Sequence, residues 1–239
     1  MQHSPDDPFQ TRNHILSALP DEELDRLRTG LQPVELYRGK LLWASYEPIE
    51  HVWFPEAGIA SMIAPLESGE GLEVGMIGRE GVIGLPVAFG VDETPCRAEI
   101  QVPGHGLRME TSAFRREMER SPVLRGLLLR YAQAFFNQIS QTAACNGRHP
   151  INERLARWLL MSHDRTDEDE LPLTQEYLSI MLGVRRPGVT VAAGTLVKAG
   201  LIRNQNGRIT ILNRNGLELV SCECYGLVRD YSEQLFGRA

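Results

Sequence analysis

The chain has 239 residues, of which 42% are hydrophobic and 23% are charged, and its formal net charge at pH 7 is −6. This length predicts two compact domains, and this composition excludes a disordered chain. No apolar run approaches the roughly 18 to 20 residues that span a bilayer. Residues 1–10 also lack the basic and apolar regions of a secretion signal, so we expect a cytoplasmic protein without membrane contact.

The N-terminal half predicts a sheet-rich domain framed by helices, at residues 1–120. Apolar residues at helical intervals in residues 5–30 indicate short helices, one of which begins at Pro20-Asp21-Glu22. From Pro33 to about Met109, short β-type runs alternate with glycine, proline and acidic turn residues. This regular spacing is typical of an antiparallel roll or barrel.

A long helix is predicted at residues 121–145, with Ser121 as its N-cap and Pro122 in its first turn. Gly147 and Pro150 should break it, so we place a dimerisation segment and hinge at residues 121–148. One face should cover the roll. A row of residues spaced alternately by four and three positions should pack against the same helix of a second copy of the chain. The alternative is that the helix is an ordinary core helix of a monomer. The row consists of Leu124, Leu128, Tyr131, Phe135, Gln138 and Thr142.

The C-terminal part, residues 149–239, contains two predicted helices joined by a short turn and followed by a hairpin. Thr174 can cap the first helix, Gly183 can form the turn, and the second helix runs from about Arg186 to Ala199. Asn206-Gly207, between two alternating runs, is a strong hairpin signal. Together these elements predict a winged helix-turn-helix.

Residues 171–216 form a basic island in an acidic chain. They contain six arginine and lysine residues and only one acidic residue, Glu176, which gives a net charge of +5. Such an island favours contact with a polyanion, because lysine and arginine displace counterions from the phosphates of DNA.

The stretch LTQEYLSIMLGVRRPGVTVAAGTLVKAGLI resembles the winged helix-turn-helix of the Crp/Fnr family of bacterial transcription regulators. The order of β-roll, long helix, hinge and winged helix is also similar to that family. The resemblance implies an α+β fold and a homodimeric regulator that binds double-stranded DNA at a pseudo-palindromic operator. The stretches GMIGREGVIGLP and SCECYG resemble a subgroup whose sensor domain lacks the nucleotide-binding residues.

The resemblance also implies which residues contact DNA. Arg186 fits the place of an arginine that relatives carry in the first turn of the recognition helix, and it can pair with a guanine edge. Pro187 and Val191 replace the Glu and the second Arg that relatives often have, so the usual half-site is not assumed. Pro187 and Gly188 are slim and should let the helix end approach DNA. The remaining candidates should contact phosphates: Arg185, Thr190, Thr174, Gln175 and Arg208.

The ligand of the predicted roll stays open. Leu85 and Cys96 stand where nucleotide-binding relatives have a Glu and an Arg, so cyclic AMP is disfavoured. The glycine-rich stretch 74–86 could place backbone amides around another anion. Residues assigned to such a ligand are Gly84, Leu85, Arg97, Arg79 and Glu80. The alternative is a roll that binds nothing and only supports the dimer.

Other functions have weaker signals in the sequence. The chain carries no motif of a nucleophilic, metallohydrolase or nucleotide-hydrolysing enzyme, so no catalytic residue is expected. The six histidines show no metal spacing, and an N-terminal iron–sulfur cysteine cluster is absent. Cys222 and Cys224 lack a second ligand pair nearby in sequence, which favours packing over a metal site. An interaction module that binds another protein, such as RNA polymerase, is the alternative to a DNA-binding regulator.

Overall fold

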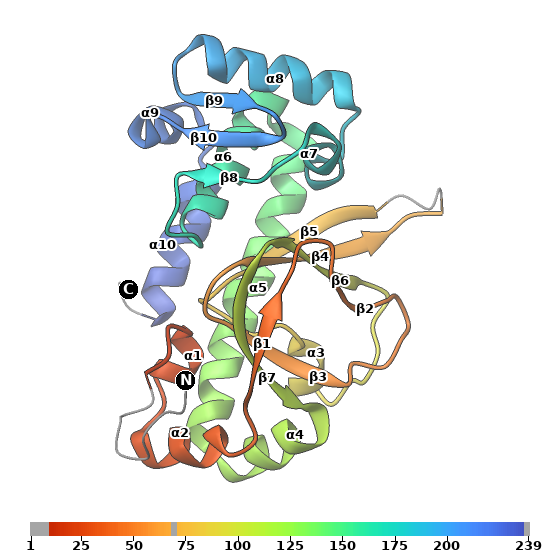
Figure 1. Ribbon diagram of the computed structural model, residues 1–239, viewed down its shortest axis with the longest axis vertical. Helices are drawn as coiled ribbons and strands as arrows, with labels where there is room; N and C mark the ends of the chain where they lie inside the picture. Colours follow the sequence, from red (N-terminus) through yellow and green to blue (C-terminus); the bar gives the residue numbers. More distant parts are fainter. Residues whose placement is uncertain (1–9, 68–70, 237–239) are drawn as a thin grey trace.

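The structure is a computed structural model that describes residues 10–67 and 71–236. Its N-terminal half contains two antiparallel sheets, as Figure 1 shows, with strand orders β1-β7-β3 and β2-β6-β4-β5. The antiparallel roll predicted from the spacing of turns is confirmed. Its strands are β1 (Gln32–Leu36), β2 (Leu41–Trp43), β3 (His51–Pro55), β4 (Ile59–Pro65), β5 (Gly71–Ile77), β6 (Arg97–Val102) and β7 (Gly104–Glu110).

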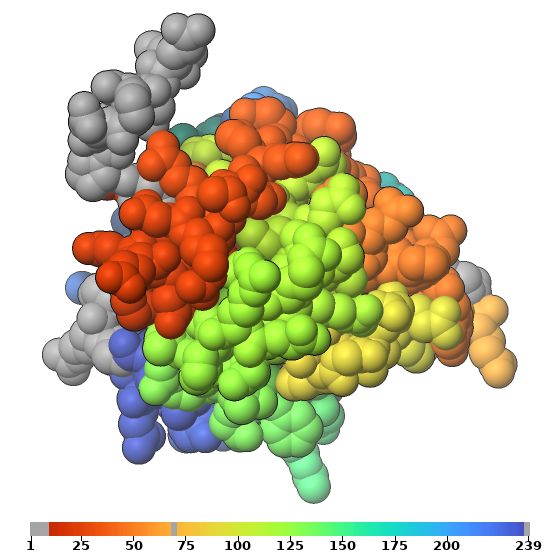
Figure 2. Space-filling model, turned by 90° about the horizontal axis from the view of Figure 1, so that it is seen from below, coloured from red at the N-terminus to blue at the C-terminus, as the bar shows by residue number. Residues whose placement is uncertain are grey.

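Four short helices pack around the sheets: α1 (His14–Ser17), α2 (Asp21–Arg28), α3 (Leu85–Ala88) and α4 (Thr111–Arg120). Phe54 of β3 and Phe114 of α4 are both fully buried, with ring centroids 6.2 Å apart, and they join sheet and helix in the core. Figure 2 shows this end of the molecule, where α1 and α2 (red) lie beside α4 and the start of α5 (light green). No secretion signal was predicted in residues 1–10. Residues 1–9 of that segment lie outside the described residues.

The long helix α5 (Pro122–Arg148) begins where the sequence predicted, since the Ser121 hydroxyl accepts a hydrogen bond from the Leu124 amide at 2.8 Å. The expectation that Gly147 breaks it was wrong, because the helix continues through Gly147 to Arg148. A glycine costs a helix only about 1 kcal/mol. Pro150 instead ends it, by holding His149 in an extended conformation with ψ 146°.

The row predicted to face a second copy packs inside the chain instead. Leu124, Leu128, Tyr131, Phe135 and Gln138 are buried against the roll, and the Gln138 side chain bonds both backbone groups of Met76. Thr142 accepts a hydrogen bond from Arg157 at 3.1 Å. Hydrophobic periodicity marks a covered face without saying which chain covers it, and here the roll does.

Two glycines of the 74–86 stretch allow α5 to approach the roll closely. A Cβ at Gly75 would lie 2.6 Å from the Phe135 ring, and a Cβ at Gly81 would overlap the Tyr131 ring. The Gly78 amide donates to the carboxylate of Glu80 at 3.1 Å. Ring packing at Gly75 and Gly81 and the Glu80 carboxylate at Gly78 therefore occupy three of the four glycine positions that the sequence offered to an external anion.

The C-terminal half is the predicted winged helix-turn-helix (Figure 1), with the hairpin as its wing. Two helices that the sequence did not predict, α9 and α10, complete it, and α10 packs beside α5. The elements are α6 (Ile151–His163), β8 (Glu170–Leu171), α7 (Gln175–Leu182), α8 (Arg186–Lys198), β9 (Ile202–Gln205), β10 (Arg208–Ile211), α9 (Arg214–Val220) and α10 (Cys224–Phe236).

The two halves pack against each other through α6 and α7. The Tyr177 hydroxyl of α7 donates to Glu99 of β6 at 2.8 Å, and the Arg38 guanidinium lies 4.7 Å from the centre of the Tyr177 ring. The Trp158 indole of α6 donates to the buried Glu73 of β5 at 2.7 Å. Among the residues that the structure describes, no helix is both long and apolar enough to cross a membrane.

Candidate nucleic-acid interface

The turn between α7 and α8 is built from the residues that the sequence assigned to it. The Thr174 hydroxyl accepts a hydrogen bond from the Tyr177 amide at 3.3 Å and caps α7. Gly183 ends α7 in the left-handed conformation, at φ 60°, which favours glycine. α8 then begins at Arg186, with Pro187 in the first turn, where a missing backbone N–H leaves no helical bond unmade.

α8 has one buried face and one exposed face. Val189, Ala192, Ala193 and Leu196 are buried on the side that packs against α6 and α7. The opposite side begins with polar and basic residues and lies at the end of the molecule remote from α2 and α4 (Figure 1). This exposed surface, which we call the α8 face, contains Arg185, Arg186, Pro187, Thr190 and Val191, the last with 71% of its surface exposed.

Side chains at the start of α7 contact the α8 face. The Arg186 guanidinium pairs with the Glu176 carboxylate at 2.6 Å, and both side chains are mostly exposed. The Thr190 hydroxyl lies 2.9 Å from the Gln175 side-chain oxygen, to which it donates. Gln175 and Thr190 therefore lie together, as expected of two residues assigned to one interface, while Glu176 places a negative charge beside Arg186.

The wing brings a further basic residue toward this end of the molecule. Asn206 and Gly207 both have positive φ, 51° and 73°, which gives the tight hairpin turn between β9 and β10. A Cβ at Gly207 would lie 3.3 Å from the Thr174 side chain, so the tip of the wing lies beside the start of α7. Arg208 is exposed and pairs with Glu170 at 2.6 Å.

The structure gives Gly188 a different role from the one the sequence suggested. A Cβ at this position would lie 3.1 Å from the Cδ1 atom of Ile151, at the start of α6. Gly188 therefore faces the interior, where it lets α8 pack closely on α6. The expectation that it thins the DNA-facing side needs correction, since Pro187 is exposed there and Gly188 is not.

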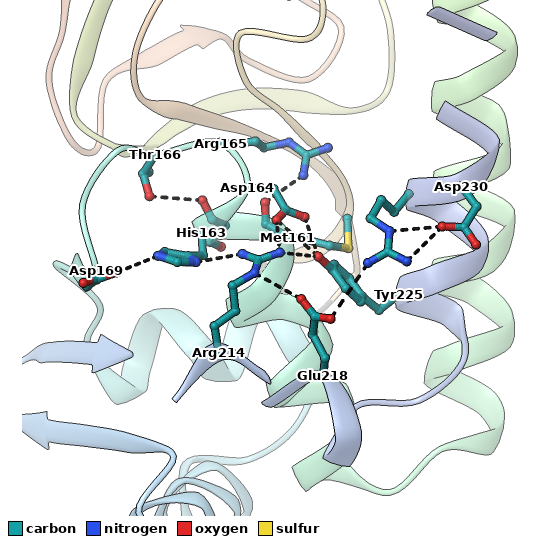
Figure 3. A network of polar contacts seen from close by, with 12 residues as sticks. Met161, His163, Asp164, Arg165, Thr166, Asp169, Arg214, Glu218, Tyr225 and Asp230 are labelled. Atoms are coloured by element: carbon teal, nitrogen blue, oxygen red, sulfur yellow. Dashed lines mark hydrogen bonds and ion pairs between the residues drawn. The ribbon is translucent and has the colours of Figure 1, made fainter. Parts of the chain in front are cut away.

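Arg214, one of the six basic residues of the island, belongs to an internal network shown in Figure 3. Its guanidinium donates to Asp164 at 2.6 Å, to the Tyr225 hydroxyl at 2.6 Å and to Glu218 at 3.1 Å, and it lies 2.8 Å from Nδ1 of His163. His163 and Asp164 stand at the C-terminal end of α6, Arg214 and Glu218 lie on α9, and Tyr225 lies on α10. The network fastens the C-terminal helices to the end of α6, and Asp164 and Glu218 neutralise the charge of Arg214.

The five residues assigned to a sensor ligand do not converge. Arg79 pairs with Asp167 at 2.9 Å, and Glu80 pairs with Arg165 at 2.8 Å, which consumes both charges within the chain. Gly84 and Leu85 line an apolar groove of about 270 Å³ beside α5. Arg97 lines a separate hollow near Gly71 and the α7–α8 turn. Three separate locations cannot hold one small anion.

An apolar row with exposed and half-buried members runs along the outer face of α5. Phe136 is 66% exposed and Leu129 is 64% exposed, and the apolar groove continues from this row through Phe89 of the α3 region. The spacing again alternates between three and four residues, one position away from the buried row. We call this surface the α5 seam: Leu129, Ala132, Phe136, Ile139 and Ala143.

Comparison with known proteins identifies the C-terminal part. Residues 153–220 match the family model of the Crp-like helix-turn-helix domain. No curated protein sequence matches the chain.

Solved structures with the same fold are Crp/Fnr-type proteins. FixK2 from Bradyrhizobium japonicum is 17% identical with a TM-score of 0.68, over 80% of this chain and 98% of its own. A putative Crp/Fnr regulator from Eubacterium rectale is 15% identical with a TM-score of 0.67, over 86% and 96%. A Crp/Fnr regulator from Thermus thermophilus is 20% identical with a TM-score of 0.64, over 80% and 98%. Residues 153–220 thus belong to the Crp-like helix-turn-helix family, and the chain around them has the fold of Crp/Fnr transcription regulators.

Proposed function

We propose that this chain is a sequence-specific DNA-binding transcription regulator that acts as a homodimer on a pseudo-palindromic operator. The observation that carries the proposal is the α8 face, where the start of an exposed helix presents Arg185, Arg186 and Thr190 at one end of the molecule. A helix of this kind fits the major groove, where each base pair offers a distinct pattern of donors and acceptors.

Each residue of the interface takes a role that follows from its chemistry. Arg186 has the forked donors that match O6 and N7 of guanine. Arg185 precedes the helix, and Arg208 lies on the wing, so both fit contacts with flanking phosphates. Thr174, Gln175 and Thr190 offer hydroxyl and amide groups for phosphate contacts beside them. Glu176 and Glu170 must release Arg186 and Arg208 when these contacts form.

The α5 seam supports a homodimer. Leu129 and Phe136 are exposed on the seam, with the half-buried Ala132 between them, and a monomer rarely leaves a large apolar patch in water. A second copy of α5, packed along it, would cover both residues and the adjoining groove. This replaces the buried row that the sequence assigned to the interface.

The contacts of the roll favour a regulator that does not depend on an anionic ligand. Arg79 and Glu80 are already paired within the chain, and Leu85 lies in an apolar groove where relatives that bind nucleotides would need a carboxylate. We therefore propose that the roll supports the dimer without binding cyclic AMP.

Fluorescence anisotropy with a labelled random duplex tests DNA binding directly. We expect binding that weakens steeply between about 50 and about 200 mM salt, because released counterions dominate non-specific affinity. Affinity that stays flat across this range, or no binding at low salt, would overturn the proposal. Capture of RNA polymerase without DNA binding would instead favour the interaction module.

A further inference from the structure

Four metal-binding side chains meet where α5 ends and α10 begins, away from the α8 face. Cys145 lies in the last turn of α5 and His149 is its C-cap, while Cys222 lies between α9 and α10 and Cys224 is the first residue of α10. Their ligand atoms all lie within 4.8 Å of one another. The three cysteines are buried free thiols. The sequence did not reveal the cluster, because Cys145 stands 77 positions before Cys222 and His149 stands 75 positions before Cys224.

Two of the separations between these atoms are close to those around a single tetrahedral metal ion. Zinc binds thiolate sulfur at about 2.3 Å and imidazole nitrogen at about 2.0 to 2.1 Å. Tetrahedral geometry then places two sulfurs about 3.8 Å apart, and a sulfur and a nitrogen about 3.5 Å apart. In the structure, the Cys145 and Cys222 sulfurs are 3.5 Å apart, and the Cys224 sulfur lies 3.5 Å from Nδ1 of His149.

The residues around the cluster complete such a site. Nε2 of His149 lies 3.2 Å from the Glu223 carboxylate, which leaves Nδ1 facing the sulfurs. A carboxylate on the far nitrogen is the common partner of a histidine ligand, because it orients the ring and raises its basicity. The Gln141 side chain donates to the Cys224 sulfur at 3.0 Å, as expected for a sulfur that carries negative charge.

Two buried arginines lie beside the cluster, where they line a small cavity together with Cys145 and Glu73. Arg154 and Arg157 are 8% and 5% exposed, and within residues 10–67 and 71–236 neither forms an ion pair. The Nε atoms of both lack a hydrogen-bond partner. A buried unpaired cation is strongly unfavourable. Three thiolates and a neutral histidine around a divalent ion carry a net charge of −1, which would offset this.

We propose that Cys145, His149, Cys222 and Cys224 bind one structural zinc ion. All four coordination positions are filled by protein, so the ion has no open position for catalysis. The ion would fasten the start of α10 to the hinge end of α5, and thereby fix the C-terminal domain to the long helix. This proposal is independent of DNA binding.

The first experiment measures metal in the full-length chain, purified under reducing conditions, by inductively coupled plasma mass spectrometry. We expect one zinc per chain, with loss of zinc in Cys222→Ser and Cys224→Ser. Cys96→Ser is the matched control, because Cys96 lies in the roll, outside the cluster, and this variant should keep its zinc. His149→Cys should also keep zinc, since it supplies a fourth thiolate.

A second measurement guards against variants that fail to fold. The wild-type chain, stripped with a chelator and given cobalt(II), should show the intense visible bands of a tetrahedral thiolate site. Glu223→Gln alters only an exposed side chain, and we expect it to weaken cobalt and zinc binding by about 10-fold. Thiol titration of the zinc-loaded chain should find Cys96 reactive and the other three cysteines protected.

Three results would overturn the proposal. One is a stripped chain that binds neither zinc nor cobalt at equimolar concentration. Another is a native chain whose mass is about 2 Da lower because two of the clustered cysteines form a disulfide. The third is the visible absorption of an iron–sulfur centre in the purified protein.

Discussion

The Arg186 guanidinium pairs with the Glu176 carboxylate at 2.6 Å, across the turn that joins the two helices of the DNA-binding unit. The residue expected to read a base edge is therefore held by an acidic neighbour in the free chain. An exposed pair of this kind contributes about 0 to 1 kcal/mol. A guanine edge, worth about 1 to 3 kcal/mol of discrimination, can displace it.

Replacing Arg186 by Ala should weaken binding to the preferred operator by about 5- to 150-fold and relax the preference at one base position of each half-site. Arg116→Ala is the matched control, because it removes the same charge from the exposed surface of α4, at the far end of the molecule. Anisotropy titrations with operator variants measure both. Equal losses for the two variants would mean that Arg186 contributes only net charge.

Replacing Glu176 by Gln should raise affinity for DNA up to about fivefold, since it frees Arg186 and removes a charge that repels phosphates. The gain should shrink at high salt, where exposed charges are screened. Glu22→Gln, an equally exposed change on α2, should leave affinity unchanged. Weaker binding of Glu176→Gln would indicate that the carboxylate itself contacts DNA, for example at a cytosine.

Gly188→Ala tests the packing role of this glycine. The new methyl group lies close to the flexible end of Ile151 and in ordinary contact with Val184, and Ala gains about 0.8 to 1 kcal/mol of helix propensity. Stability should therefore stay within about 1 kcal/mol of wild type. Gly188→Leu should cost about 1 to 3 kcal/mol by overpacking against Ile151. Urea unfolding measures both. A Gly188→Leu variant as stable as wild type would place position 188 on an open surface.

Glu73 should make stability depend on pH. Burial raises its pKa from 4.5 to about 7, against the opposing effects of hydrogen bonds from Ser61 and Trp158 and the charge of Arg157. The folded state binds the proton of the Glu73 carboxyl more tightly than the unfolded state does. The protonated carboxyl therefore contributes fully to the free energy of unfolding below about pH 4.5, and this contribution is lost as pH rises through about 7. At about 1.4 kcal/mol per pKa unit, the loss is at most about 3.5 kcal/mol.

Glu73→Gln should remove this dependence, because an amide retains an acceptor for Trp158 and carries no charge. Urea unfolding at about pH 5 and about pH 8 should find the variant more stable than wild type at the higher pH only. Glu47→Gln, at an exposed position, is the control. Parallel pH profiles for wild type and Glu73→Gln would show that Glu73 ionises normally in the folded chain.

Phe136→Asp should convert the proposed dimer to a monomer, because it puts a charge in the middle of the α5 seam. Leu219→Asp makes the same change at a side chain that is 88% exposed on α9, and this variant should remain dimeric. Sedimentation velocity distinguishes the two masses. A Phe136→Asp chain that stays dimeric would place the interface elsewhere.

Local signals predicted most of the fold. The N-cap Ser121, the left-handed Gly183 and the Asn206-Gly207 turn each act within a few residues, so the sequence was sufficient to place α5, the helix-turn-helix and the wing. The predictions that were wrong concern contacts between segments that are distant in the sequence. The spacing of α5 marked an apolar row, but only the packed roll decides that Tyr131 faces inward and Phe136 outward.

In the candidate site, too, local features were predicted from the sequence and contacts between distant residues were not. The position of Arg186 at a helix start is visible in sequence, whereas its pairing with Glu176 depends on how two helices cross. Gly188 was assigned to the DNA side because Ile151, its neighbour in space, stands 37 positions earlier in the chain. The cysteine and histidine pairs likewise come together only when α10 packs on α5.

Selection of bound sequences from a pool of random DNA duplexes tests the central claim most directly. A dimer with two α8 faces should enrich a pseudo-palindrome whose half-sites are centred about 10 to 10.5 base pairs apart, or a multiple of this, with a guanine in each half-site that Arg186→Ala no longer selects. A pool that stays random, or enrichment of a single asymmetric half-site that is unchanged in Arg186→Ala, would contradict the account.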